Sequence, residues 1–178
     1  PTPVETVVVE GAAAITNRFV PVTPTRVLDT RVGVGAPVGP VAPGASLLLR
    51  IVGSAAPVPA GATAVVLNLT VTEPRGQTFV TVHPDGEPLP TASSLNIDYA
   101  GQTVANLVTA RLGGGAVRIY SQTATHLVAD VAGYYVPSTS SAGGRFVPTT
   151  PTRLLDTRSG PGRTGALGAG GSLDLRSE

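Results

Sequence analysis

The sequence predicts an all-β fold: an antiparallel β-sandwich of jelly-roll or immunoglobulin-like type, with a barrel as the alternative. Apolar residues recur with a period of two along several segments, which is the spacing of half-buried strands. Turn formers are frequent, since 22 Gly and 17 Pro occur among 178 residues. Turn signals separate the alternating segments roughly every 8 to 12 residues, which predicts about eight to ten short strands.

The segment at 63–72 shows the alternation most clearly, with an apolar side chain at every second position from Val65 to Val71. The PRG that follows at 74–76 predicts a hairpin to the next strand. No segment has a convincing helical period. The predicted strands are 4–11, 46–53, 63–72, 77–83, 93–99, 103–112, 116–121 and 125–136.

One fourteen-residue phrase occurs twice in the chain. Residues 18–31 read RFVPVTPTRVLDTR (the first phrase) and residues 145–158 read RFVPTTPTRLLDTR (the second phrase), so twelve of fourteen positions are identical. The offset matches the size of an ordinary domain. The predicted organisation is an N-terminal strand or arm at 1–17, a complete β repeat unit at 18–136, a linker at 137–144 and the beginning of a second repeat unit at 145–178.

Each phrase holds an acidic residue between two arginines. The residues are Arg26, Asp29 and Arg31 in the first phrase and Arg153, Asp156 and Arg158 in the second. Such a group could bind an anionic or sugar ligand, or it could fix a strand end through hydrogen bonds between carboxylate and guanidinium. The proline-spaced segment ahead of it needs anchoring to a sheet, which favours the second interpretation. We therefore predict a structural repeat motif.

The two histidines are the remaining candidates for chemistry. Asp130 follows His126 by four residues, on the same face of a regular strand, and we expect the two to form a structural pair. Together with Ser93 and Ser94 they are components of a hydrolytic triad, but no nucleophile motif such as GxSxG surrounds the serines. His83 is expected in an exposed turn. The sequence thus predicts no catalytic residues and no enzyme.

Charge and composition restrict the partners. Lys+Arg number 12 and Asp+Glu 11, every basic residue is Arg, and no basic block occurs, which argues against a nucleic-acid surface. Without Cys, and with only two His, neither a cofactor nor a transition-metal site is predicted. A single Ca²⁺ at Asp85, Glu87 or Asp98 is the alternative. Residues 51–72 carry no charge, but their prolines and glycines argue against a membrane span.

A resemblance to a known repeat comes from PTRVLDTR, VVLNLTVTEP, FVTVHPDG, SSLN, TVANLV and THLVADVAGYY. These segments are similar to a repeat found in secreted and surface-attached proteins of actinobacteria and their relatives. The resemblance covers residues 18–136 and again 145–158. It implies an extracellular or cell-surface location and modular use, in tandem or beside secreted hydrolases.

The expected function is a non-catalytic structural or adhesive module of a secreted, repeat-built surface protein. Self-association or contact with neighbouring repeat units is expected, with the phrase as the joint between successive units and head-to-tail assembly into a fibre. The alternative is a module that binds cell-wall or extracellular glycan for a tethered hydrolase. Few aromatic residues are present for that purpose: Phe19 and Phe146 are expected to pack as anchors, and the adjacent Tyr134 and Tyr135 must point to opposite faces of a strand.

Overall fold

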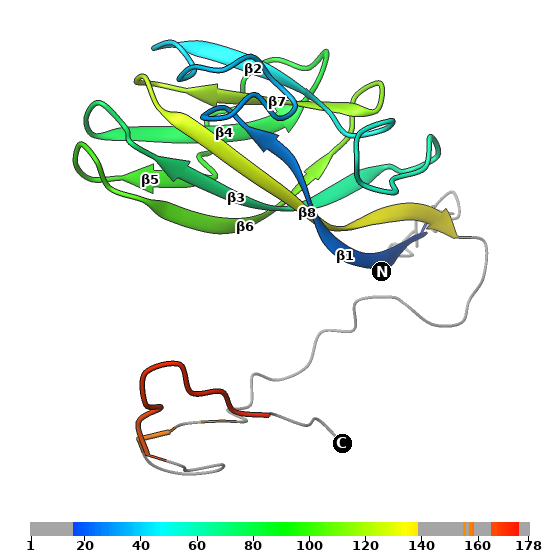
Figure 1. Ribbon diagram of the computed structural model, residues 1–178. Coiled ribbons are helices and arrows are strands. Elements are labelled where there is room, and N and C mark those ends of the chain that lie inside the picture. Colours follow the sequence, from blue (N-terminus) through cyan, green and yellow to red (C-terminus); the bar gives the residue numbers. More distant parts are fainter. Residues whose placement is uncertain (1–15, 139–154, 156, 159–164, 175–178) are drawn as a thin grey trace, which may run out of the picture. The chain divides into compact units, whose positions relative to one another are not determined.

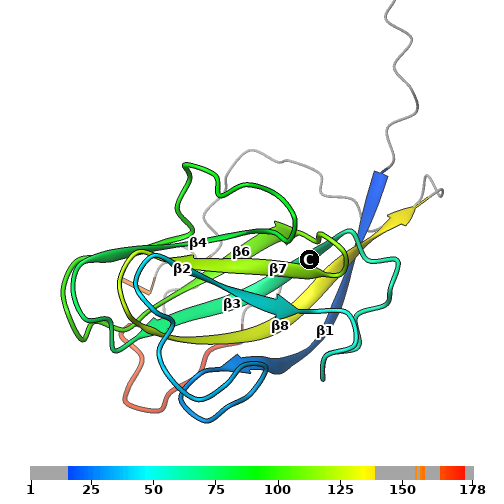
Figure 2. The same ribbon diagram turned by 90° about the horizontal axis from the view of Figure 1, so that it is seen from above.

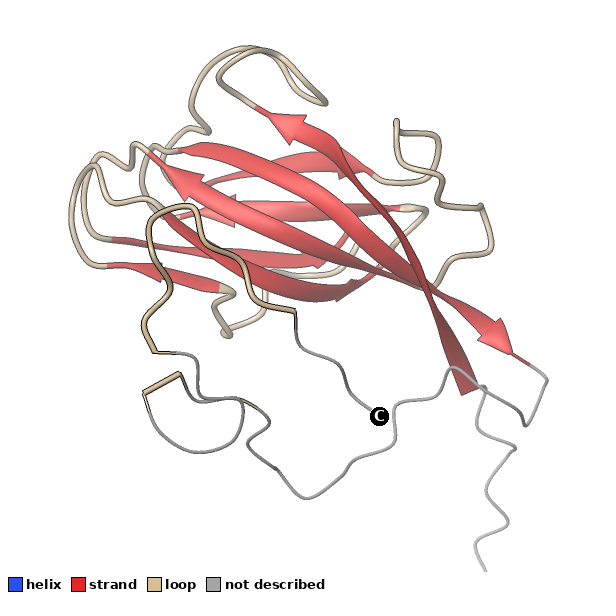
Figure 3. Ribbon diagram, turned by 60° about the horizontal axis from the view of Figure 1, so that its bottom comes forward, coloured by secondary structure: helices blue, strands red, loops and turns tan. Residues whose placement is uncertain are grey.

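The computed structural model describes residues 16–138, 155, 157–158 and 165–174. The chain divides into two compact units, Pro1–Arg145 and Phe146–Glu178. The described residues contain eight strands, all in the first unit, and no helix (Figure 3). The described part of the chain therefore has no helix that is long and apolar enough to cross a membrane. The strand predicted at 4–11 lies outside the described residues.

Two four-stranded antiparallel sheets are stacked in the first unit (Figures 1 and 2). One sheet has the order β1-β8-β3-β6, with β1 at Thr16–Asp29, β8 at His126–Ser138, β3 at Ala64–Thr72 and β6 at Val104–Arg111. The other has the order β2-β7-β4-β5, with β2 at Ala45–Arg50, β7 at Ala116–Ser121, β4 at Thr78–Pro84 and β5 at Leu95–Ile97. The sheets stay separate, so the unit is a β-sandwich and not a barrel, which confirms the predicted fold class.

The core lies between the two sheets, and strand alternation decides which side chains reach it. Every second residue of β3 from Val65 to Val71 is fully buried, as the sequence pattern predicts. On the neighbouring strand β8, three of the residues paired with them are also fully buried: Leu127, Ala129 and Val131. Each fully buried Val or Leu contributes about 1.5–3 kcal/mol relative to an exposed one. The alternating pattern therefore specifies both the strands and the inner faces.

The predicted hairpin between 63–72 and 77–83 is wrong. β3 pairs with β6 and β8, whereas β4 pairs with β5 and β7, so residues 73–77 carry the chain from one sheet to the other. Glu73 makes this turn with a φ of 54°, in the left-handed region that residues with a Cβ seldom occupy. Alternation shows that both strands are half-buried, but it does not show which sheet each one joins.

The strands β1 and β8 are the longest, with 14 and 13 residues. They continue past the other strands as a two-stranded ribbon (Figure 1). Thr16 pairs with Ser138, whereas the neighbouring strand β3 begins only at Ala64, opposite Tyr135. The chain therefore enters and leaves the sandwich at adjacent positions.

Candidate functional site

The first phrase forms most of β1 and the turn that follows it. β1 is an edge strand, where prolines such as Pro21 and Pro24 are tolerated because only one side of the strand must donate to a neighbour. Its register with β8 shifts between Pro21 and Thr25 and again between Arg26 and Leu28. The sequence indicated an extended arm here, and the structure shows a complete strand.

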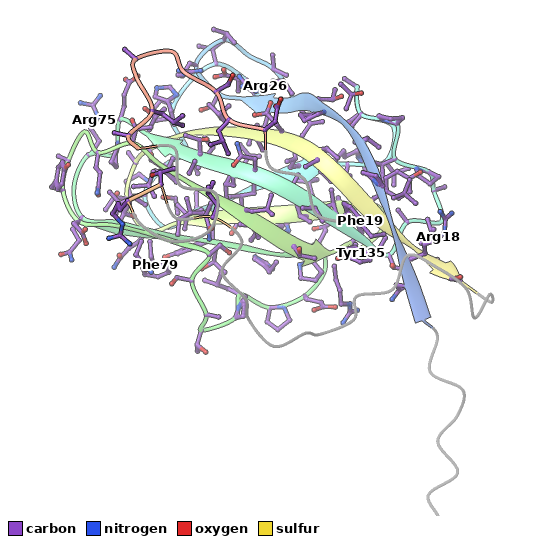
Figure 4. The ribbon with its side chains drawn as sticks, turned by 90° about the horizontal axis from the view of Figure 1, so that it is seen from below. Arg18, Phe19, Arg26, Arg75, Phe79 and Tyr135 are labelled. Atoms are coloured by element: carbon purple, nitrogen blue, oxygen red, sulfur yellow. The ribbon has the colours of Figure 1, made fainter. Side chains whose placement is uncertain are left out.

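A network of four charged side chains fixes the end of β1. The carboxylate of Asp29 is almost fully buried and accepts hydrogen bonds from Arg31 Nε (2.9 Å), Arg31 Nη2 (2.7 Å) and the Arg31 backbone N–H (3.1 Å). Arg26 Nη1 donates to the same carboxylate at 3.1 Å. Arg26 also donates to Asp130 on β8, through Nε at 2.6 Å and Nη2 at 3.3 Å. Arg26, labelled in Figure 4, therefore bridges the two strands.

The electrostatics of this network favour the ionised forms. Hydrogen bonds from the Arg31 side chain lower the pKa of Asp29 from 3.8 to about 2, against the opposing effect of burial. The hydrogen bond to Asp130 raises the pKa of Arg26, and that to Asp29 raises the pKa of Arg31. The carboxylate of Asp29 is thus ionised at neutral pH, and Arg26 and Arg31 donate all the hydrogen bonds described above to it. Such a group suits anchoring, not proton transfer.

Thr30 attaches the same turn to β8 at a second point. Its side chain is fully buried, and its hydroxyl accepts from the Leu127 backbone N–H at 3.0 Å and lies 3.0 Å from His126 Nδ1. The Thr30 backbone N–H donates to the Leu127 carbonyl at 3.0 Å. The alternation of the sequence did not indicate this buried threonine.

The predicted pair of His126 and Asp130 needs correction, because each side chain has a different partner. His126 meets Thr30, and Asp130 meets Arg26. Four residues along a strand span about 13 Å, which is too far for a direct hydrogen bond even on a shared face. Both residues contact the end of the first phrase: Asp130 binds Arg26 in β1, and His126 binds Thr30 in the turn that follows.

The aromatic start of the first phrase also rests on β8. The ring of Phe19 lies against Gly133, where a Cβ would overlap both that ring and the Val20 carbonyl. Phe19 and Tyr135 have ring centroids 5.3 Å apart and an interplanar angle of 51° (Figure 4). Tyr134 packs against the core on the opposite face, as expected for adjacent strand residues. We call Asp130, Gly133 and Tyr135 the β8 receiver, since they hold the two ends of the phrase.

The second phrase is described only in part. Arg153 and Asp156 lie outside the described residues, and Arg158 is exposed. The likeness of the second phrase to the first therefore rests on the sequence. It retains the aromatic and charged residues that contact the receiver in the first phrase. The two substitutions replace core-facing residues: Val22, which packs against the core, becomes Thr149, and the buried Val27 becomes Leu154.

His83 is buried, contrary to the expected exposed turn. It lies within β4, is only 4% exposed, and neither of its ring nitrogens has a hydrogen-bond partner in the described part of the chain. The turn begins later than the sequence suggests, because β4 continues to Pro84. A proline at the end of a strand can be its last residue as well as the first of a turn.

Two of the carboxylates considered for Ca²⁺ are engaged by arginines. Asp85 pairs with Arg118 at 2.7 Å, and Glu87 pairs with Arg111 at 3.1 Å. The described residues contain no group of three or more His, Cys, Asp or Glu that could hold a metal ion. The function of these acids in the structure is to form ion pairs at the strand ends.

No protein-family model, curated protein or solved structure matches this chain. The geometry of the first unit is therefore the basis for assigning a role to the phrase.

Proposed function

We propose that this protein is a non-catalytic structural module of a secreted, repeat-built cell-surface protein. The observation that supports this most is the use of the charged groups in the first phrase: Arg26, Asp29 and Arg31 bond to one another and to Asp130. They hold an edge strand on the sandwich, and such an anchoring role needs no substrate or cofactor. Adjacent points of chain entrance and exit also suit a module that is used in series.

The sequence led us to expect that each phrase joins one unit to the next, but the first phrase pairs within its own unit. The first phrase docks on β8 of its own unit, so it is the closing strand of that unit and not a link to another one. The printed sequence contains two phrases but one DVAGYY segment, which supplies the receiver. The second phrase can therefore open a further unit, or it can replace the first phrase on the receiver of another molecule.

Self-association by exchange of the two phrases is the second of these possibilities, and the residues that the two phrases share support it. The second phrase offers Phe146, Arg153 and Asp156 where the first offers Phe19, Arg26 and Asp29. Exchange of a nearly identical element between protomers can reuse the contacts made within one molecule. Here the aromatic and charged contacts would be kept, and the buried Val27 would be replaced by Leu154. Repeated in one direction, it gives the head-to-tail assembly that the sequence suggests.

The proposed extracellular or cell-surface location is supported by the resemblance of residues 18–136 to repeats of secreted and surface-attached proteins. The absence of Cys does not oppose it, because the sandwich has a continuous apolar core and needs no disulfide to stabilise it.

Light scattering coupled to size exclusion tests self-association. We expect the wild-type chain to form concentration-dependent oligomers and the double variant Phe146→Ala/Asp156→Ala to be monomeric, because the variant removes both kinds of anchor from the second phrase. Thr149→Val is the matched control, since it makes the second phrase more like the first and should preserve the oligomers. A wild-type chain that stays monomeric at all concentrations would exclude exchange between molecules.

A further inference from the structure

A hollow of about 450 Å³ opens at the end of the sandwich where the chain passes from β3 to β4. Its lining residues are Pro40, Glu73, Pro74, Arg75, Ala100, Gly101 and His126. Prolines and small residues form much of its lining, and Glu73, Arg75 and His126 supply its polar part. Apolar walls with a few polar groups are the usual composition of a small-molecule site.

Within the part of the chain that the structure describes, the two charged side chains of this hollow form no hydrogen bond or ion pair. Glu73 and Arg75 have no side-chain hydrogen bond or ion pair with the rest of the described chain, in contrast to Asp29, Asp85 and Glu87. Arg31 adds a positive field near Glu73, but its guanidinium is bonded to Asp29. An acceptor and a donor are therefore available for a ligand.

The third polar group, His126, can present a donor at Nε2 in the tautomer whose Nδ1 accepts from Thr30. The buried hydroxyl of Thr30 already accepts from the Leu127 N–H, so its own proton needs an acceptor, and His126 Nδ1 at 3.0 Å is the one within reach. A neutral imidazole that accepts at Nδ1 carries its proton on Nε2. Nε2 has no protein partner and is not among the buried unsatisfied atoms of the described residues, so its N–H is accessible.

Glu73, which lines this hollow, has a strained backbone conformation. Its φ of 54° is the one positive value among the described residues other than glycine. A left-handed residue with a Cβ costs about 1–2 kcal/mol, and such residues cluster at functional sites. Glycine would make the same turn without strain, but it would remove the carboxylate.

We propose that this hollow binds a neutral sugar unit of a glycan. Each sugar hydroxyl can donate to Glu73 while accepting from Arg75 or from His126 Nε2–H. The opposite charges of Glu73 and Arg75 cancel, which disfavours a simple anion or cation relative to a neutral polyol. Tyr99, 62% exposed, belongs to the turn that forms one wall, where the Gly101 N–H donates to the Pro74 carbonyl at 2.9 Å. This site uses no residue of the β8 receiver, but it shares His126 with the contact that attaches Thr30 to β8. The test therefore relies on Glu73 and Arg75, which lie outside that contact.

Titration of the isotope-labelled full chain, followed by NMR, tests the site. The probes are neutral methyl glycosides of hexoses and of an N-acetylhexosamine, with inorganic phosphate and acetate as anion probes. We expect at least one glycoside to shift the amide signals of Glu73, Arg75, residues 99–101 and His126 in a saturable way. Glu73→Gln and Arg75→Gln should each weaken that binding about tenfold or more, since each removes a charged hydrogen bond.

The control variant is Glu87→Gln, which alters a comparable acid that is already paired with Arg111 and should leave glycoside binding unchanged. No saturable shift with any glycoside would overturn the proposal. So would binding of phosphate or acetate in preference to every glycoside, which would make the hollow an anion site. Insensitivity of glycoside binding to Glu73→Gln would place the sugar elsewhere and also contradict it.

Discussion

Replacement of Asp29 by alanine is expected to lower the free energy of unfolding of the first unit by about 2 kcal/mol. The substitution removes the carboxylate that accepts from Arg26, from the Arg31 side chain and from the Arg31 backbone, so that the end of β1 loses its anchor. Both guanidinium groups keep access to water, which limits the loss. Urea unfolding followed by circular dichroism measures the effect.

The second phrase supplies the matched control. Asp156→Ala makes the same chemical change in the unit Phe146–Glu178. At protein concentrations where the chain is monomeric, it should leave the unfolding of the first unit unchanged. Equal effects of the two substitutions, or no effect of Asp29→Ala, would show that the network does not hold β1.

The same variant should also change the response to acid. The pKa of Asp29 is about 2 in the folded chain and 3.8 ordinarily, so between these values the unfolded chain binds more protons than the folded one. Stability from this group is therefore complete above about pH 4 and is lost as the pH falls towards 2. The difference in unfolding free energy between wild type and Asp29→Ala should be largest at pH 6 and should narrow at pH 2.5.

Replacement of Gly133 by alanine should cost about 2 kcal/mol, although the change adds a single methyl group. Gly133 has an ordinary strand conformation, so the cost comes from overlap with the Phe19 ring and the Val20 carbonyl and not from backbone strain. Gly61→Ala is the control, because nothing lies within 4 Å of its added methyl and its φ is not positive. We expect that control to stay within about 0.5 kcal/mol of wild type.

A double-mutant cycle assigns the cost at Gly133 to the phrase. Phe19→Ala removes the ring that the new methyl would meet, so the combined variant should be less destabilised than the sum of the two single variants. Additive effects would mean that the methyl group disturbs something other than Phe19.

The strands of this sandwich could be predicted because their alternation is regular. Residues 63–72 and 125–136 correspond closely to β3 and β8, and their inner faces are the ones that the pattern indicates. Two features could not be predicted in this way. The prolines of the first phrase interrupt the alternating pattern, so the sequence showed no sign of the edge strand β1. The length of a connection such as 73–77 does not tell whether the chain turns back within one sheet or crosses to the other.

The sequence predicted a structural role for the charged residues of the first phrase, but it did not predict their partner on β8. The repeat indicated that Arg26, Asp29 and Arg31 act together, and the spacing within the phrase brought them close. Asp130 is 104 residues from Arg26, and a single sequence gives no signal for a contact over that distance. The sequence did not indicate the proposed role of Glu73 either, because its positive φ arises where the chain crosses between the sheets and the local pattern gives no signal for it.

Disulfide trapping gives the most direct test of the central claim that the two phrases are interchangeable strands for one receiver. The chain has no cysteine, so two introduced thiols are its only ones. Arg18→Cys/Val136→Cys joins residues that are paired in register and should close within one chain. Arg145→Cys/Val136→Cys places the thiol at the same position of the second phrase, and we predict disulfide-linked dimers and longer multimers. Free thiols in this second variant, or a bond formed only within single chains, would contradict head-to-tail assembly through the phrase.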